Sequence, residues 1–340
     1  MQTLASHNRA DLSALAFSFT HISNEVFEGI CRPSPYLSSL VMTYVDQPVD
    51  LNRASVGDDH DALVRALSTH CLEIEVLSLP KWCITYSALI ALANLIYLRE
   101  LDLSGCSNVT GGGVCSLLVS LCGKLEKLML TGSCIDTTLL QSIGENCTKL
   151  TCLKLHIIDL GIDLPLIYAS LIFMIIKCQL LKIVDFGNEV CIFADTIMMT
   201  LAHACRGLKT LVVTGCSDVG LSILLTSCQQ LEQLTLFRMK ASVEPTLPII
   251  EKSCPNLRGL TIQSDFITDM QLCSIFKQCP NMLGFCLVCP LMSDATIMTL
   301  LEFCPKLKLI GILGPTQVTS AAPLTGFTHL EHIDILSGGV

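Results

Sequence analysis

Twenty cysteines are the residues of this 340-residue chain with the widest chemical range. A thiolate can act as a nucleophile, a metal ligand or one half of a disulfide bond. Cys254 is followed by apolar residues at the third, sixth and eighth positions, and Cys279 begins the same pattern again. The function predicted for the chain depends on whether these cysteines react, bind metal or pack.

The cysteines recur at one position of a repeat. Eleven anchor positions precede the apolar pattern, in ten steps of 23 to 31 residues with a mean of 25.6. Leu95 and Phe327 stand at the same position, and neither can bind a metal or attack a substrate. Because free cysteine is among the most buried residue types, we interpret the anchor cysteines as packing residues. The anchors are Cys71, Leu95, Cys122, Cys147, Cys178, Cys205, Cys228, Cys254, Cys279, Cys304 and Phe327.

Three smaller groups of residues could also carry chemistry. Cys286 and Cys289 form a lone C-x-x-C, whereas zinc needs four ligands and a redox pair normally opens a helix. The run Asp58-Asp-His-Asp61 could bind a hard cation, but a solvated loop is the simpler interpretation. His329-Leu-Glu-His332 lacks a matching carboxylate motif. We therefore predict a protein that is not an enzyme and holds no cofactor or metal.

Each repeat divides into a strand and a helix. The pattern L-x-x-L-x-L, as at Leu101 and Leu103, predicts a short strand whose alternate residues point inward. Apolar residues then follow at helical spacing, as in residues 269–279 and 294–304. Thr268 and Gln271 fit a capping box. The predicted N-caps are Thr110, Asp136, Thr268, Ser293 and Thr319.

A strand and a helix at fixed period predict an α/β solenoid, because each repeat can bury its apolar face only against its neighbours. We expect a horseshoe with parallel strands on the concave face and helices on the convex face. Residues 1–70 are predicted to hold one or two degenerate repeats and a polar insert at 46–61. Residues 71–340 are predicted to hold about eleven repeats.

Charge and hydropathy restrict the partners. The net charge is −9 and no basic stripe is visible, which argues against nucleic acid and anionic membranes. The apolar run from Leu164 to Ile176 has 13 residues, whereas a membrane span needs about 20. The first apolar run is short and follows Asp11, which makes a poor signal peptide. We expect reduced thiols and a cytoplasmic location, with the nucleus as the alternative.

The repeat resembles the cysteine-containing class of leucine-rich repeats, C-x-x-L-x-x-L-x-L-x-x-C-x-x-[IV]-T-D. The motif is carried by Cys205, Leu208, Leu211, Val213 and Cys216, and by residues 266–269. This class is typical of F-box/leucine-rich-repeat proteins and of proteins similar to the antagonist of mitotic exit. The resemblance implies substrate recognition or an adaptor role in ubiquitin-dependent degradation, with cullin-RING ligase components as partners. We find no F-box pattern ahead of the repeats.

The residues between the leucines of each strand are expected on the concave face. The earlier repeats present a mixed-charge floor that also includes His156, and the later repeats present small and apolar residues. Because contiguous apolar patches often mark binding sites, we expect a protein partner to dock an apolar segment there. The alternative is that the C-terminal tail covers the patch. The predicted binding residues are Glu100, Asp102, Lys127, Lys154, Asp185, Gly259, Gly284, Cys286, Val288, Leu309, Gly311 and Leu313.

Two other functions are compatible with parts of the sequence. A secreted or membrane-associated leucine-rich-repeat receptor would need a signal peptide, disulfide bonds and a membrane span. A cysteine-dependent enzyme would need polar groups that converge on one thiol.

Overall fold

The computed structural model divides the chain into two compact units, Met1–Gln179 and Leu180–Val340. We call them unit 1 and unit 2 and describe each by itself. The structure describes residues 13–19, 29, 31–32, 34–44, 60–121, 123–132, 135–156, 164–187, 195–215, 217–237, 254–264, 267–288, 293–313 and 326–336.

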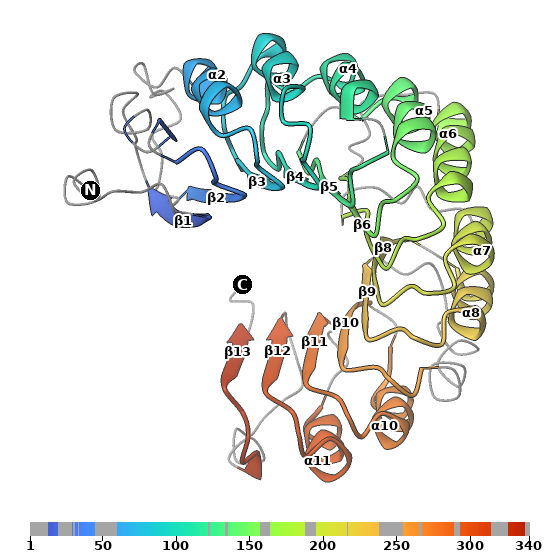
Figure 1. Ribbon diagram of the computed structural model, residues 1–340. Helices are drawn as coiled ribbons and strands as arrows, with labels where there is room; N and C mark the ends of the chain where they lie inside the picture. The colour runs from blue at the N-terminus through green and yellow to red at the C-terminus, as the bar shows by residue number, and fades with distance from the viewer. Residues whose placement is uncertain are drawn as a thin grey trace. The chain divides into compact units, whose positions relative to one another are not determined.

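Unit 1 consists of a parallel sheet with helices along one side (Figure 1). Each strand pairs with the next strand along the chain. The strands are β1 (Ala14–Phe19), β2 (Ser39–Tyr44), β3 (Val76–Ser78), β4 (Glu100–Asp102), β5 (Lys127–Met129) and β6 (Cys152–Lys154). The helices are α2 (His60–His70), α3 (Tyr86–Leu92), α4 (Gly111–Leu121), α5 (Thr137–Asn146) and α6 (Leu164–Lys177).

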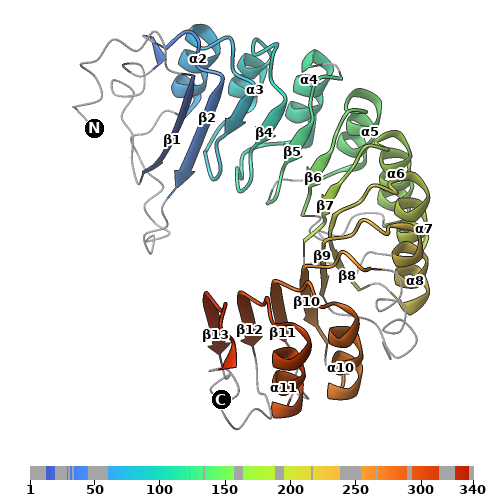
Figure 2. The ribbon, with the colours of Figure 1, turned by 60° about the horizontal axis from the view of Figure 1, so that its bottom comes forward.

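Unit 2 repeats this arrangement (Figure 2). Its strands also pair in parallel with their chain neighbours. They are β7 (Ile183–Asp185), β8 (Thr210–Thr214), β9 (Gln233–Phe237), β10 (Gly259–Gln263), β11 (Gly284–Val288), β12 (Leu309–Leu313) and β13 (His332–Leu336). The described helices are α7 (Asp195–Ala204), α8 (Asp218–Ser227), α10 (Asp269–Gln278) and α11 (Asp294–Phe303). The predicted α/β solenoid of parallel strands and covering helices is confirmed.

The strand of each repeat buries every second side chain. In β4 the side chain of Leu101 is fully buried, whereas Glu100 and Asp102 are half-exposed on the opposite face. Leu98 and Leu103, before and after this strand, are also buried. We call the sheet face that points away from the helices the strand face. It corresponds to the predicted concave face and carries the candidate binding residues.

The anchor residues lie where a helix turns into the next strand. The carbonyl of Cys147 accepts a hydrogen bond from the N–H of Leu150 at 3.1 Å, and Cys205 and Leu208 make the same turn at 3.0 Å. Every described anchor is buried, and none of the described cysteines forms a disulfide bond. The packing interpretation is thus confirmed for the described anchors, and Cys122 lies outside the described residues.

Anchor thiols also connect consecutive repeats. The Sγ of Cys178 donates a weak hydrogen bond to the carbonyl of Cys147 at 3.5 Å. The Sγ of Cys304 does the same to the carbonyl of Cys279 at 3.6 Å. Each of these carbonyls lies at the end of a helix and already accepts a backbone N–H, from Leu150 and from Met282, so the thiol adds a second and weaker donor. Cysteine therefore combines small apolar volume with a weak donor at this position.

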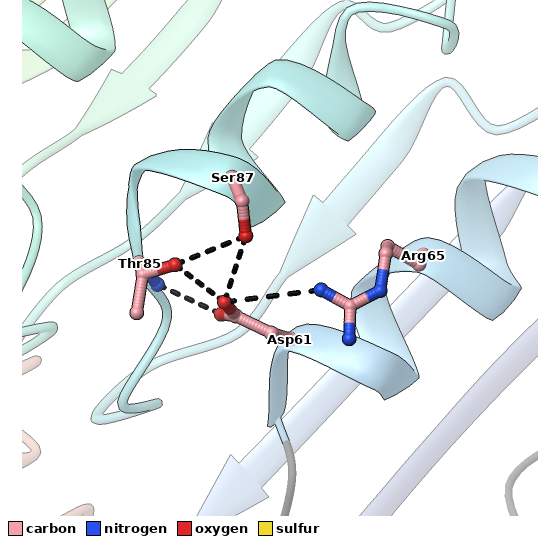
Figure 3. A network of polar contacts seen from close by, with 4 residues as sticks. All are labelled: Asp61, Arg65, Thr85 and Ser87. Atoms are coloured by element: carbon pink, nitrogen blue, oxygen red, sulfur yellow. Dashed lines mark hydrogen bonds and ion pairs between the residues drawn. The ribbon is translucent and has the colours of Figure 1, made fainter.

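A carboxylate at the start of one helix binds the start of the next helix. Figure 3 shows Asp61, near the beginning of α2, among Arg65 of the same helix and two residues of the following repeat. Asp61 Oδ1 accepts from the backbone N–H of Thr85 at 2.8 Å, and Oδ2 accepts from the hydroxyls of Ser87, at 3.0 Å, and Thr85. Thr85 is the N-cap of α3, so Asp61 supplies the anion that this helix terminus favours.

The same contact recurs in unit 2. Asp269 of α10 accepts from the backbone N–H of Ser293 at 3.0 Å and from the hydroxyls of Ser293 and Thr296 at the start of α11. Asp195 of α7 accepts from the hydroxyl of Ser217, the N-cap of α8, at 2.6 Å. In these three pairs of repeats, an aspartate hydrogen-bonds the start of one helix to the start of the next.

Most predicted helix starts are confirmed. Asp136 accepts from the N–H of Leu139 at 2.7 Å, Ser293 from Ala295 at 3.3 Å, and Thr110 from Gly113 at 3.3 Å. In the predicted capping box, Gln271 Oε1 accepts from the N–H of Thr268 at 2.8 Å. Thr319 lies outside the described residues.

The interpretation of the 58–61 run as a loop is wrong for its second half. His60 and Asp61 begin α2, because Asp61 bonds to the next repeat and His60 stacks on Trp82 with ring centroids 4.8 Å apart. Asp58 and Asp59 lie outside the described residues. The apolar run at 164–176 forms α6, which has 14 residues. Among the described residues no helix has the length and apolarity to cross a membrane.

Candidate functional site

The strand face of unit 1 carries charges that largely neutralise one another. Lys127 Nζ lies 2.8 Å from Glu100 Oε1, and this hydrogen bond raises the pKa of Lys127 above its usual value. Asp102 accepts from the hydroxyl of Ser78 at 3.0 Å and from the backbone N–H of Ser104 at 2.9 Å. Glu100, Asp102 and Lys127 therefore support the stacking of their own strands.

Lys154 and His156 extend this face beyond β5. Lys154 is half-exposed, and no carboxylate among the described residues pairs with its ammonium group. It is therefore the basic group of this floor that is most available to a partner. Asp185, in unit 2, accepts from the backbone N–H of Gly187 at 2.9 Å and so repeats the role of Asp102 at the end of its own strand.

The strand face of unit 2 brings the small residues of three strands into register. Gly259, Gly284 and Leu309 form one row across β10, β11 and β12, and Thr261, Cys286 and Gly311 form the next. Gln263, Val288 and Leu313 form the third row. The predicted small and apolar positions therefore lie side by side. The side chain of Leu313 lies outside the described residues.

A groove of about 200 Å³ runs over these strands. Because Gly259 and Gly284 lack side chains, the backbone forms its floor. Leu309 borders the groove and is 42% exposed. The lining residues are Gln233, Leu234, Thr235, Gly259, Leu260, Thr261, Gly284, Phe285, Cys286 and Leu309.

A second hollow of about 350 Å³ adjoins the groove at the edge where the strands begin. It shares Gln233, Gly259 and Gly284 with the groove and adds Glu232 and Arg258. The hydrogen bond from Lys209, 2.7 Å away, lowers the pKa of the exposed Glu232 carboxyl. The groove is thus neutral along its floor and charged at one end.

Gly311 lies on the predicted face but does not line the groove. It is buried, and a Cβ at this position would lie 2.8 Å from the Sγ of Cys286. Gly311 therefore makes room for the Cys286 side chain, which occupies the surface in its place. Gly284 differs, since the nearest atom to an added Cβ would be Leu309 Cβ at 4.0 Å.

Sequence reasoning missed the contribution of β9 and of the strand edge. Gln233 and Thr235 stand in the same columns as Gly259 and Thr261, one repeat earlier. The alternation along β9 places them on this face, but they are polar and so do not belong to the apolar patch that the sequence indicates. Glu232 and Arg258 precede their strands, where alternation within the strand gives no signal.

The alternative that the C-terminal tail covers the groove stays a prediction, because only the expected final strand is described. Residues 332–336 form β13, which continues the sheet beside β12. Residues 337–340 lie outside the described residues.

The other chemical candidates do not form a site in the described residues. Burial raises the pKa of the Cys106, Cys178 and Cys304 thiols to about 12, which keeps them protonated and unreactive near neutral pH. The described residues contain no group of three or more histidine, cysteine or acidic side chains placed to hold a metal ion. His332 begins β13, and Glu331 beside it pairs with Lys308 at 2.6 Å. Cys289 lies outside the described residues.

Comparison with known proteins gives structural neighbours. No protein-family model and no curated protein sequence matches the chain. Among solved structures, yeast Rad7 in its complex with Elc1 has 17% identity and a TM-score of 0.58, over 95% of this chain and 80% of that one. The leucine-rich repeat-containing protein LegL7 from Legionella pneumophila has 14% identity and a TM-score of 0.44, over 81% and 91%. TLR13, solved with ssRNA13, has 13% identity and a TM-score of 0.44, over 97% and 44%.

These similarities lie below the identity at which function can be transferred, so they concern architecture. Rad7 matches over nearly the whole chain. The observed repeat of one parallel strand and one covering helix every 25 residues or so agrees with it. The chain has the fold of a leucine-rich-repeat solenoid.

Proposed function

We propose that the chain is a non-catalytic protein-binding module whose strand face receives its partner. The observation that carries this proposal is the groove on β9 to β12, where Gly259 and Gly284 expose backbone beside Leu309. A groove with a backbone floor and an aliphatic rim suits an apolar segment of a protein, since apolar surface is removed from water without displacing a charge. Repeat solenoids commonly use this face for binding.

The polar contacts in this proposal come from two places. Glu232 and Arg258 at the edge of the groove can contact backbone or polar side chains of the bound segment. Lys154 offers a basic contact on the strand face of unit 1. Polar groups at a rim mainly orient a partner, whereas the buried apolar centre supplies most of the binding free energy.

We further propose that the partner is a substrate or subunit in ubiquitin-dependent protein degradation. The support is the resemblance of the repeat motif to F-box/leucine-rich-repeat proteins. A second support is that Rad7, the neighbour with the TM-score of 0.58, was solved in a complex with another protein, Elc1. We further propose a cytoplasmic or nuclear location, since the fifteen described cysteines form no disulfide bonds and reduced thiols persist in reducing compartments.

Affinity capture with a charged groove variant tests the proposal. Gly284→Glu puts a carboxylate in the groove, and the space around Gly284 accommodates the new side chain. The matched control is Gly207→Glu, in the turn between α7 and β8, where an added Cβ meets no atom within 4 Å. Both proteins and the unchanged chain are used as baits, and captured proteins are quantified by mass spectrometry.

We expect one set of proteins to be lost with Gly284→Glu and retained with Gly207→Glu, and we expect cullin-RING ligase subunits or ubiquitylated proteins among them. An identical set for all three baits would refute binding in the groove. A lost set without any component of the ubiquitin system would refute the pathway and leave the binding face in place. Gly311→Glu is unsuitable, since it would displace Cys286 and disturb the fold.

A further inference from the structure

Unit 1 has a hollow of its own, away from its strand face, at the edge where the strands begin. It measures about 260 Å³ and lies on the turns that lead into β4, β5 and β6. Its lining combines two large apolar side chains with four charged ones. The lining residues are Ile96, Tyr97, Arg99, Lys124, Glu126 and Lys149.

Ile96 and Tyr97 are adjacent large side chains that both leave apolar surface in water. Their exposed fractions are 50% and 56%. They occupy the two positions that follow the anchor Leu95. In every other described repeat at least one of these two positions holds a polar residue, a glycine or a proline. Tyrosine is among the residue types most enriched in the centres of protein interfaces. The pair therefore marks this edge as a surface that a partner covers.

Three positive and two negative groups surround this pair. Arg99 lies between Glu126, at 2.9 Å, and Glu75, at 3.4 Å. Lys124 Nζ donates to the uncharged carbonyl of Ile96 at 2.9 Å, so its charge is not neutralised there. Lys149 is exposed, and no carboxylate of the described residues pairs with it. Two ammonium groups thus flank an exposed aromatic ring in a chain whose net charge is −9.

We propose that this hollow binds an acidic peptide segment that carries one large apolar side chain. The apolar side chain packs on Ile96 and Tyr97, and carboxylates of the peptide pair with Lys124 and Lys149. A carboxylate is the complementary group for an ammonium that lacks an anionic partner. Glu75 and Glu126 lie on the same edge and pair with Arg99, so the carboxylates of the peptide contact the two lysines instead of Arg99.

Charge reversal tests this proposal. A displayed library of random peptides is panned on the immobilised full chain, and enriched peptides are synthesised and measured by fluorescence anisotropy. The test variant is Lys124→Glu with Lys149→Glu. The matched control is Lys306→Glu, because Lys306 holds the same place in its repeat as Lys124 and donates to Asn281 Oδ1 at 3.0 Å.

We expect enriched peptides that contain Asp or Glu beside a Leu, Phe or Trp. Their affinity should fall about tenfold or more in the double variant and in Tyr97→Ser, fall with added salt, and stay unchanged in Lys306→Glu. Retained binding of the acidic peptides by the double variant would overturn the proposal, as would a panning that enriches no acidic peptides at all. Self-association of the chain that the double variant abolishes would overturn it too, since the occupant would then be a second copy.

The outcome is independent of the groove on unit 2. Peptides bound at Ile96 and Tyr97 should bind Gly284→Glu as tightly as the unchanged chain. Failure of the groove proposal therefore leaves this one standing, and failure here leaves the groove proposal standing. Circular dichroism of each variant shows that a loss of binding is not a loss of fold.

Discussion

An anchor cysteine meets two demands of a tight turn between a helix and a strand. The side chain is small enough for the close approach of two repeats, and its thiol reaches the carbonyl of the preceding anchor, as in Cys228 and Cys205 at 3.6 Å. Burial raises the pKa of Cys228 to about 11 and that of Cys254 to about 12. At these two anchors, burial therefore keeps the thiol protonated and unreactive near neutral pH.

Thiol labelling should separate the anchors from the surface cysteines. Cys83 is exposed, so among the described cysteines we expect it to react first with a maleimide at pH 8. A thiol with a pKa of about 12, such as Cys304, is ionised to only about one part in ten thousand at that pH. Peptide mapping by mass spectrometry should find the described anchors unlabelled until denaturant is added. Labelling of Cys304 as fast as Cys83 in native buffer would contradict the packing role.

The aspartate between repeats makes stability depend on acid pH. Burial of Asp61 acts to raise its pKa, but the hydrogen bonds from Thr85 and Ser87 outweigh this and lower the pKa. A carboxyl whose pKa falls on folding stabilises the protein above its unfolded pKa, about 4, and loses that contribution as the pH drops through the folded value. Asp269 has a lowered pKa for the same reasons.

Asp61→Asn should therefore reduce the free energy of unfolding by about 1.5–3 kcal/mol at pH 7, the range for hydrogen bonds to a charged group. The difference from the unchanged protein should shrink as the pH falls below about 4, which urea unfolding at several pH values would measure. The control is Arg65→Gln, which should cost under about 0.5 kcal/mol, because that ion pair is 3.9 Å long and the arginine side chain is 49% exposed. A pH-independent loss in Asp61→Asn would contradict the role of the charge.

At the scale of elements, α5 and α6 approach each other closely at a glycine. A Cβ added to Gly144 of α5 would lie 2.9 Å from a ring carbon of Phe173 and 3.1 Å from the Cα of Met174, both in α6. The backbone of α6 cannot yield as easily as a side chain. Gly144 thus sets the spacing of this helix pair, and the apolar composition of α6 reflects burial against α5 on one of its sides.

Gly144→Val should destabilise the protein by about 2–3 kcal/mol, since overpacking at a helix contact forces a backbone shift. Gly112→Ala, on the solvent side of α4, should instead stabilise it by about 0.5 kcal/mol, because no atom lies within 4 Å of the new Cβ and alanine favours the helix. Thermal unfolding of both variants measures the contrast. Equal effects would show that α5 and α6 do not pack as described.

Most elements could be predicted because each one is set by local spacing. The helices expected at 269–279 and 294–304 are observed as α10 and α11. The leucines at positions 101 and 103 were enough to predict β4. The contact of Asp61 with Thr85 could not be predicted, since it joins residues 24 apart whose proximity depends on how repeats stack. The strand β1 was also missed, because its repeat lacks the anchor pattern.

The candidate face could be predicted in outline but not in depth. Alternation along each strand placed Gly259 and Gly284 on the correct side of the sheet. The same rule placed Gly311 there, where the Cys286 side chain lies over it. Whether a residue is covered by its neighbour on the adjacent strand depends on the direction of that neighbour's side chain. The alternation of residues along one strand does not contain that information.

For the whole molecule, the stacking of repeats implies that stability is local. Helices pack on the helices of adjacent repeats and strands pair with adjacent strands, so a change in one repeat is felt first by its neighbours. The two proposed binding surfaces lie in different units. The groove of unit 2 is lined by uncharged residues, and the hollow of unit 1 includes two lysines that lack an anionic partner among the described residues. The two surfaces share no lining residue, so under these proposals one partner could bind without displacing the other.

Hydrogen exchange of two matched variants should reveal this locality. Asp269→Asn removes the charged acceptor between α10 and α11, so amide exchange should speed up in those helices and in β11 while α4 and α5 keep the protection of the unchanged chain. Asp61→Asn should do the reverse, with faster exchange in α2 and α3 and none of the change in α10. Peptide-resolved exchange followed by mass spectrometry gives both patterns in one experiment. If either variant speeds exchange equally in both units, the chain unfolds as one cooperative block, and nearest-neighbour stacking does not describe its energetics.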